Sequence, residues 1–327
     1  MVVPSDSSST SKMTYRFLGD SGLLVSKLGL GTYMSDESKY EGDFWYDVMT
    51  LAYRHGINFF DSAEAYGHGK TEVMLGKAIK RGVAEGVWSR EDLVITPKIF
   101  QGTKSGPNAT GVNRKHVVED TRASLRRLDQ DYVDVIFCHR SDLHTPIEET
   151  VRAMNYVIDQ AGPSTGAPAS GARPTSSRPA RSQTDSDSSE VVEQPQYNIL
   201  ERSKVDFDLA SLYKKYKLGS RYESPPFQEG WLTAGFAENV EIADKLNPIA
   251  AELGCSIAQM SIAWAVSNKN VSTVLLGASR PEQLEETLKA VEYESKITRE
   301  MKAKIDAVVK FEPKLPQLDP FAFARTR

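Results

Sequence analysis

The chain has 327 residues, of which 40% are hydrophobic and 26% charged, and a formal net charge of −4. This composition is typical of a folded globular protein and excludes a collagen, a coiled coil or a wholly disordered chain. The lack of a basic excess argues against nucleic acid or anionic lipid as the main partner. The length suits one α/β barrel, typically ~250 residues, with extra loops and tails.

A short hairpin is predicted at 15–25, with its turn at Asp20-Ser21-Gly22. Beyond it, β-rich runs alternate with helical stretches, which predicts a parallel sheet covered by crossover helices. Asn113 is placed to cap a helix at His116–Leu128, whose apolar residues lie on one face. The predicted strands are Lys27–Tyr33, Ile57–Asp61, Leu93–Ile99, Tyr132–His139, Val192–Asn198 and Ser272–Gly277, and two later helices are Ile249–Trp264 and Pro281–Val291.

Targeting and metal signals are absent from the sequence. Cys138 and Cys255 have neither the spacing of a metal site nor that of a disulfide framework, which indicates a reduced setting without a metal. No apolar run approaches the ~20 residues of a membrane span, and residues 1–13 are rich in serine without an apolar signal core. We therefore expect a cytoplasmic protein with no direct membrane insertion and a disordered start at 1–13.

The middle of the chain breaks the alternating pattern. Residues 161–190 contain no Val, Ile, Leu, Met, Phe, Trp, Tyr or Cys, so this segment cannot contribute to a core. We expect it to be a disordered insert between the first part of the barrel at 14–160 and the remainder at 191–311, followed by a tail at 312–327.

Polar side chains follow three successive predicted strands. Asp61 ends one apolar run and Tyr66 lies in the following loop, while Lys98 and His139 end the next two runs. Singly, each is more often a cap or a solvated strand end, but together they are typical of an active site at the carboxyl ends of barrel strands. A Lys cation oriented by Asp61 would favour the phenolate of Tyr66 and so make the tyrosine a usable proton donor.

The motifs GLGTY, NFFDSAEAYGHGKTEVMLG, LVITPKI, YVDVIFCHR, TPIEETVRAM, VEQPQYNILER and VSTVLLGASRPEQLEE resemble the aldo-keto reductase superfamily. Within it, the chain is most similar to the β-subunits of voltage-gated potassium channels and their fungal relatives. The resemblance covers roughly 14–160 and 191–309. It implies a (β/α)8 TIM barrel that binds NADPH across its carboxyl-end rim and reduces aldehydes or ketones by hydride transfer.

The resemblance also implies residue roles. Asp61, Tyr66, Lys98 and His139 match the family's catalytic tetrad, with Tyr66 as general acid. Arg280 matches a cation near the adenosine 2′-phosphate, and such a cation favours binding of NADPH over NADH. Thr287 stands where the family usually has Asn. The positions matching cofactor contacts are Thr32, Tyr33, Asp61, Gln194, Gly277, Ser279, Arg280, Gln283 and Glu286.

Two strands of the expected eight are missing or replaced in this sequence. Family members carry something like GWAFYWGTSEW, the fifth strand, after the position of Gln160. Codons for that string with C or G in each free third position, read one base later, encode AGPSTGAPASG, which is residues 161–171. We therefore interpret 161–190 as largely an out-of-frame translation. A deletion near 218–220 removes the seventh strand and part of the expected cofactor cradle, so we predict an incomplete barrel.

Two functions remain open from the sequence. The first is an NADPH-dependent reductase acting on a small carbonyl substrate. The alternative is a potassium channel β-subunit-like regulatory protein that binds NADPH and associates with a channel subunit or with copies of itself. The chain as written is also compatible with a defective gene product of either kind.

Overall fold

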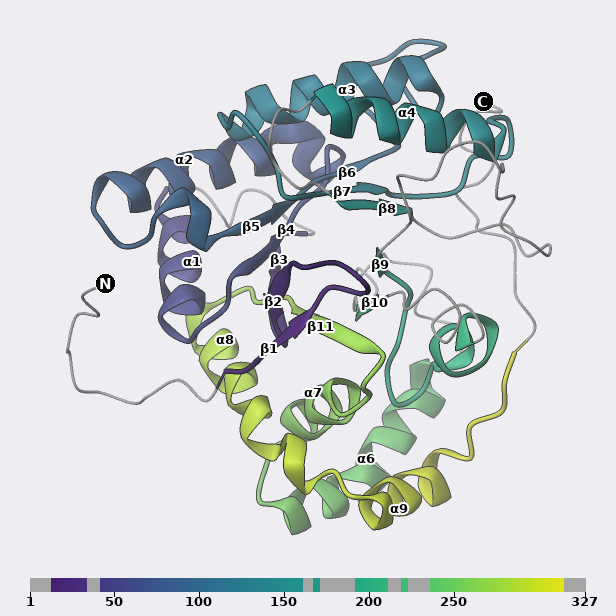
Figure 1. Ribbon diagram of the computed structural model, residues 1–327. Coiled ribbons are helices and arrows are strands. Elements are labelled where there is room, and N and C mark those ends of the chain that lie inside the picture. The colour runs from purple at the N-terminus through teal and green to yellow at the C-terminus, as the bar shows by residue number, and fades with distance from the viewer. Residues whose placement is uncertain are drawn as a thin grey trace.

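The computed structural model describes residues 13–33, 42–160, 167–170, 192–210, 219–222 and 236–314. Within these ranges a central ring of parallel strands is surrounded by helices (Figure 1). Residues 1–12, 315–327 and most of 161–190 lie outside the described residues, so the predicted disordered start, tail and insert stay predictions.

The parallel sheet closes on itself. Its order is β5-β4-β3-β11-β10-β9-β8-β7-β6. β5 and β6 flank Pro97 in one run of chain, and the Phe137 N–H donates to the Pro97 carbonyl at 3.0 Å, so the two ends of the sheet meet. The strands are therefore those of the predicted (β/α)8 barrel. They are β3 (Leu28–Gly31), β4 (Phe59–Asp61), β5 (Val94–Thr96), β6 (Lys98–Ile99), β7 (Val135–Cys138), β8 (Ala167–Ser170), β9 (Val192–Glu193), β10 (Gly219–Tyr222) and β11 (Val271–Leu276).

The places of the fifth and seventh strands are filled. β8 pairs with β7 and β9, and β10 pairs with β9 and β11, all in parallel. The sequence predicted these strands as missing or replaced, and the structure has short replacements rather than gaps. Strand pairing uses backbone groups that every residue except proline carries in full, so segments of unrelated sequence can occupy both places. Pro168 in β8 lacks the N–H that a ladder uses.

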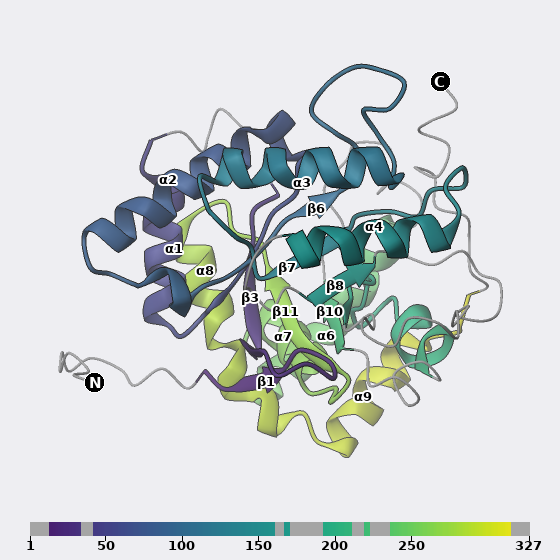
Figure 2. The same cartoon turned by 45° about the horizontal axis from the view of Figure 1, so that its top comes forward.

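The helices cover the outside of the ring, and α3 and α4 lie over β6, β7 and β8 (Figure 2). Asn113 caps α3 as predicted, since its side chain accepts from the His116 N–H at 3.0 Å. The single helix predicted over Ile249–Trp264 is wrong: Gly254, at φ +76°, ends one helix and Ser256 caps the next. The helices are α1 (Phe44–Arg54), α2 (Lys70–Ala84), α3 (Arg114–Leu128), α4 (Ile147–Gln160), α6 (Phe236–Leu253), α7 (Ile257–Val266), α8 (Pro281–Leu288) and α9 (Arg299–Val309).

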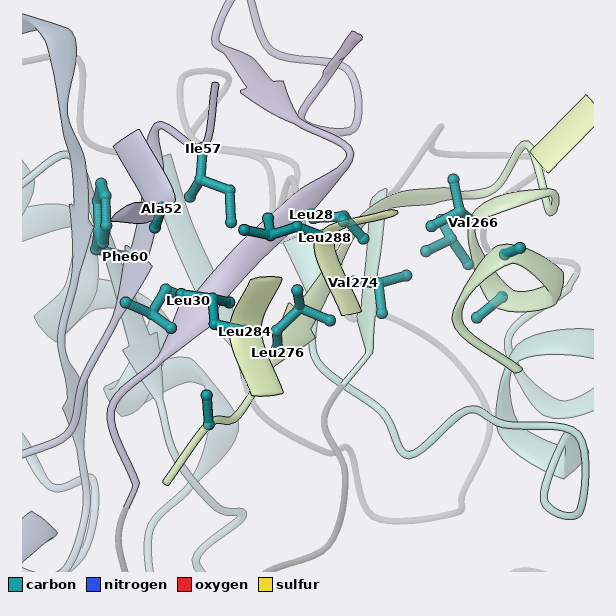
Figure 3. Packing of buried hydrophobic residues seen from close by; sticks show 14 of the residues in the cluster. Leu28, Leu30, Ala52, Ile57, Phe60, Val266, Val274, Leu276, Leu284 and Leu288 are labelled. Carbon is teal, nitrogen blue, oxygen red and sulfur yellow. The ribbon is translucent and has the colours of Figure 1, made fainter. Parts of the chain in front are cut away.

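Because side chains alternate between the two faces of each strand, those on one face pack against the helices outside the ring and those on the other fill the ring. Leu28, Leu30 and Leu276 point outward and pack against Leu284 and Leu288 of α8 (Figure 3). Each buried side chain of this kind stabilises the fold by roughly 1.5–3 kcal/mol.

The second core fills the ring. It contains Phe59, Phe137 and Leu275, and one end is closed by Leu18 and Val25 of the hairpin formed by β1 (Tyr15–Phe17) and β2 (Leu24–Ser26). This apolar filling leaves the opposite, carboxyl end of the strands for polar residues.

Among the described residues, no single helix has the length and apolar character to cross a membrane. One bent helix pair, Glu238–Leu253 with Ile257–Val266, passes that test by length and composition.

Candidate active site

Three predicted site residues lie on the same face of their strands as the side chains that fill the ring. Asp61 is two residues beyond the interior Phe59, and His139 is two beyond the interior Phe137. Lys98 follows Val94 by four residues along the interrupted strand. Because side chains alternate with a period of two, all three face the inside of the ring at its carboxyl end.

Lys98 is the centre of the arrangement. Its Nζ donates to Asp61 Oδ2 at 2.6 Å, to Tyr66 Oη at 2.8 Å and to the Ser62 carbonyl at 3.3 Å. An ammonium group has three protons, and all three are used. Since Lys98 donates to Tyr66, the phenol oxygen acts as the acceptor in that contact.

Burial makes these contacts strong. Asp61 and Lys98 are each 1% exposed and Tyr66 is 6% exposed. Thr96 Oγ1 donates to the second carboxylate oxygen of Asp61 at 2.9 Å, which fixes the rotation of the carboxylate. Removing one partner of a buried ion pair costs about 3–5 kcal/mol because the remaining charge is left uncompensated.

Two aromatic rings flank the phenol. The His139 ring centroid lies 6.0 Å from that of Tyr66 at an interplanar angle of 82°, and the Tyr33 ring lies at 5.1 Å and 75°. The structure thus brings together all four residues that the sequence predicted as catalytic. An acidic proton carried by the phenol, backed by a cation and flanked by an imidazole, is an arrangement that can protonate a bound oxygen.

Three residues predicted as cofactor contacts lie at the same end of the barrel. Thr32 follows β3, and its fully buried Oγ1 has no hydrogen-bond partner among the described residues. Gln194 directly follows β9, and Gly277 directly follows β11. A buried hydroxyl without a partner is costly, so Thr32 fits a site completed by a polar ligand group.

The residues predicted around the 2′-phosphate gather at the N-terminus of α8. Ser279 donates to Gln283 Oε1 through both its N–H, at 3.0 Å, and its hydroxyl, at 2.7 Å. Arg280 is the exposed N-cap residue, and Pro281 begins the helix. Helix N–H groups and an arginine at one helix start suit a phosphate group. Glu286 and Thr287 lie farther along α8, where Thr287 Oγ1 donates to the Gln283 carbonyl at 3.0 Å. The residues present therefore fit both ends of NADPH.

A cluster that the sequence did not predict lies beside the site. Glu64, His116 and Asp120 have potential ligand atoms within 4.8 Å of one another. Glu64 Oε1 already accepts from the Gly102 N–H at 2.7 Å and from the Phe100 N–H, so the geometry is that of a hydrogen-bonded carboxyl group. Glu64 comes from the loop after β4, whereas His116 and Asp120 lie one turn apart on α3, and no sequence spacing links Glu64 to the other two.

Burial governs protonation in this cluster. Desolvation raises the pKa of Glu64 to about 7. Burial acts to raise the pKa of Asp120, but the neighbouring Glu64 carboxyl group and the Arg127 guanidinium 3.0 Å away lower it overall. Of the two carboxyl groups, Glu64 therefore takes up a proton more readily than Asp120.

This assignment predicts a stability change with pH. The pKa of Glu64 is raised from 4.5 to about 7 on folding, so its stabilising contribution is complete below about pH 4.5 and is lost as the pH rises through about 7. We expect wild type to lose on the order of 2 kcal/mol relative to Glu64→Gln between about pH 5 and pH 8. Urea unfolding of both proteins across this range measures the difference. A constant difference would show that the proton is not on Glu64.

A closed barrel with acid–base side chains at the carboxyl ends of its strands is the architecture of a TIM-barrel enzyme. A family profile described as the aldo/keto reductase family matches residues 27–310. The chain belongs to this family, whose members are oxidoreductases, and the family predicted from the sequence motifs is confirmed.

Similar proteins agree with the family. The chain is 39% identical over 331 residues to a probable voltage-gated potassium channel subunit beta from Arabidopsis thaliana, covering 93% of this chain and 99% of that protein. It is 38% identical over 335 residues to a protein of the same description from Oryza sativa subsp. japonica, covering 92% and 98%. The crystal structure of the thermostable aldo-keto reductase Tm1743 with the inhibitor epalrestat matches with a TM-score of 0.70 and 27% identity, covering 90% of this chain and 100% of that one.

Proposed function

We propose that this protein is an NADPH-dependent reductase of aldehydes or ketones in which Tyr66 is the general acid. The observation that carries the proposal is the 2.8 Å contact from Lys98 Nζ to Tyr66 Oη, held by the buried Asp61. NADPH, when bound, supplies a hydride to the carbonyl carbon of the substrate. Tyr66 supplies the proton to the carbonyl oxygen, which yields the alcohol.

The chain's own groups make this proton transfer favourable. As the phenol O–H bond breaks, the oxygen becomes a phenolate, and the Lys98 ammonium beside it stabilises the new negative charge. His139 is placed to donate a hydrogen bond to the same carbonyl oxygen and to orient it. Asp61, Lys98 and Tyr66 are buried, which strengthens the electrostatic interactions among them.

Purified protein tests the proposal. We expect NADPH fluorescence to change on titration with the full chain, and NADPH absorbance to fall when an aromatic aldehyde is added. Binding without turnover on a panel of aldehydes and ketones would reject the reductase function. Absence of both signals would reject the cofactor as well.

The preference for NADPH over NADH is expected to depend on Arg280. Replacing Arg280 by alanine removes the cation at the start of α8, so the Kd for NADPH should rise by about 10–100-fold, while that for NADH stays within ~2-fold. Fluorescence titration with each cofactor measures both constants. Lys289→Ala, a change at the opposite end of α8, is the matched control and should leave both unchanged. Equal weakening of both cofactors in Arg280→Ala would contradict a 2′-phosphate contact.

A second candidate function comes from the named relatives. Two proteins at 39% and 38% identity are described as probable voltage-gated potassium channel beta subunits. By this analogy, the chain associates with a channel's intracellular part and uses the same site to sense NADPH. Such a role requires an assembly matching the channel's symmetry, so light scattering that finds only a monomer, with or without NADPH, argues for the free reductase.

A further inference from the structure

Glu64 lies between Asp61 and Tyr66 but belongs to neither the predicted tetrad nor the predicted cofactor contacts. It is wholly buried. Its N–H donates to the Lys98 carbonyl at 3.1 Å, and its carboxyl oxygen Oε1 accepts from the N–H groups of Gly102 and Phe100. One residue therefore binds the chain at 98, 100 and 102.

These bonds continue the connection between two strands after the sheet ends. The parallel ladder joins β4 to β5, and the Ser62 N–H still donates to the Thr96 carbonyl at 2.9 Å. Beyond that point the chain after β4 continues as the loop that carries Tyr66, whereas the other segment continues as β6 (Lys98–Ile99) and then as a loop. Glu64 joins the Tyr66 loop to β6 and to the loop that follows it.

The loop after Lys98 is shaped around the Glu64 carboxyl group. Gly102 has φ +68°, and a Cβ built on it would lie 1.9 Å from the Ala109 carbonyl oxygen, so the loop is tightly folded at the point where it donates to Glu64. The Gly111 N–H closes the loop on the Phe100 carbonyl at 2.6 Å.

Side chains of α3 also lie beside the Glu64 carboxyl group. His116 Nε2 lies 3.3 Å from Glu64 Oε1. Asp120 lies beside Glu64, with potential ligand atoms within 4.8 Å, and pairs with Arg127, which also pairs with Glu72 at 2.5 Å. The carboxyl group of Glu64 is thus held through Oε1, by two backbone donors and the His116 ring, while Oε2 has no hydrogen-bond partner among the described residues.

We propose that Glu64 is a positioning residue that sets the contact between Tyr66 and Lys98 by joining the loop that carries Tyr66 to β6, which carries Lys98, and to the loop after β6. This inference rests on the proposed reductase function for its kinetic test, but the geometry of the phenol can be measured without turnover. Loss of the Glu64 bonds lets the Tyr66 loop move relative to Lys98, which weakens stabilisation of the phenolate.

The test compares Glu64→Ala, Glu64→Asp and Glu64→Gln in the full chain. Alanine cannot accept the two N–H bonds, so kcat should fall by on the order of 10²-fold with KM for NADPH within ~2-fold, and the alkaline limb of the kcat profile should move to higher pH. Glutamine has the same length and retains an oxygen that can accept from the N–H groups of Phe100 and Gly102, so its kcat should stay within ~3-fold of wild type. Aspartate is one methylene shorter than glutamate, so we expect Glu64→Asp to lose kcat as Glu64→Ala does. Glu64→Asp therefore serves as the test if Glu64→Ala does not fold.

Failure of this inference is distinguishable from failure of the reductase function. If wild type turns over and Glu64→Ala and Glu64→Asp keep its kcat and pH profile, the positioning role is wrong. A loss in Glu64→Gln as large as in Glu64→Ala also overturns it. If wild type has no turnover, NMR of isotope-labelled tyrosine provides the test, with the Tyr66 signal assigned by comparison with Tyr66→Phe. We expect the Tyr66 phenol to titrate at higher pH in Glu64→Asp than in wild type. An unchanged titration overturns the proposal.

Discussion

Replacing Tyr66 by phenylalanine should lower kcat/KM for aldehyde reduction by ~10³-fold, because general acid catalysis contributes about 10²–10⁴-fold. The substitution removes the hydroxyl that Lys98 Nζ contacts at 2.8 Å and leaves the ring, which packs beside Tyr33 and His139, in place. The Kd for NADPH should change by less than ~3-fold. Steady-state kinetics and fluorescence titration measure the two effects.

The matched control is Tyr293→Phe. Its hydroxyl donates to the Gly254 carbonyl at 3.1 Å on an exposed part of the molecule, and neither residue belongs to the predicted site. It removes the same atom and should leave kcat/KM unchanged. An unchanged kcat/KM in Tyr66→Phe would contradict the proposed role of Tyr66 as the general acid.

Restoring the alternative reading frame over residues 161–190 should have the largest effect on stability. We propose that this segment is read one base out of frame. In the shifted frame, the T and C of each TCN serine codon become the second and third bases of a codon, which encodes Ile, Leu, Val or Phe whichever base precedes them. The segment contains many serines but no strongly apolar residue. The frame change therefore turns a segment that cannot bury a core into one that can.

A re-framed chain should be more stable by at least about 3 kcal/mol, since two or more newly buried apolar side chains contribute roughly 1.5–3 kcal/mol each. Its Kd for NADPH should also fall. The control is a chain in which residues 161–190 keep their composition but are shuffled, and this chain should match the original in both respects. Urea unfolding and cofactor titration compare the three proteins. Equal stability of all three would contradict the frame proposal, as would a transcript that lacks the in-frame strand.

The fold was largely predictable because the hydrophobic pattern of a parallel barrel is local. A spacing of two residues puts Asp61 on the same strand face as the interior Phe59, and His139 on the same face as the interior Phe137. The sequence therefore shows which side chains face the inside of the barrel. The break at Gly254 was missed because apolar residues continue on both sides of it, so periodicity alone did not separate α6 from α7. The strand at Val192–Glu193 is shorter than predicted, as strand ends depend on which neighbour is available to pair.

The sequence alone determined the family, the barrel and the residues Asp61, Tyr66, Lys98 and His139, because each stands at a strand end whose direction the alternating pattern defines. Only the tertiary structure decided that Thr96 holds Asp61 and that Glu64 meets His116 and Asp120. These contacts join segments 35 to 56 residues apart in the chain, through closure of the ring and the packing of α3. No local preference encodes such distances, because they exist only once the strands have paired and the helices have packed.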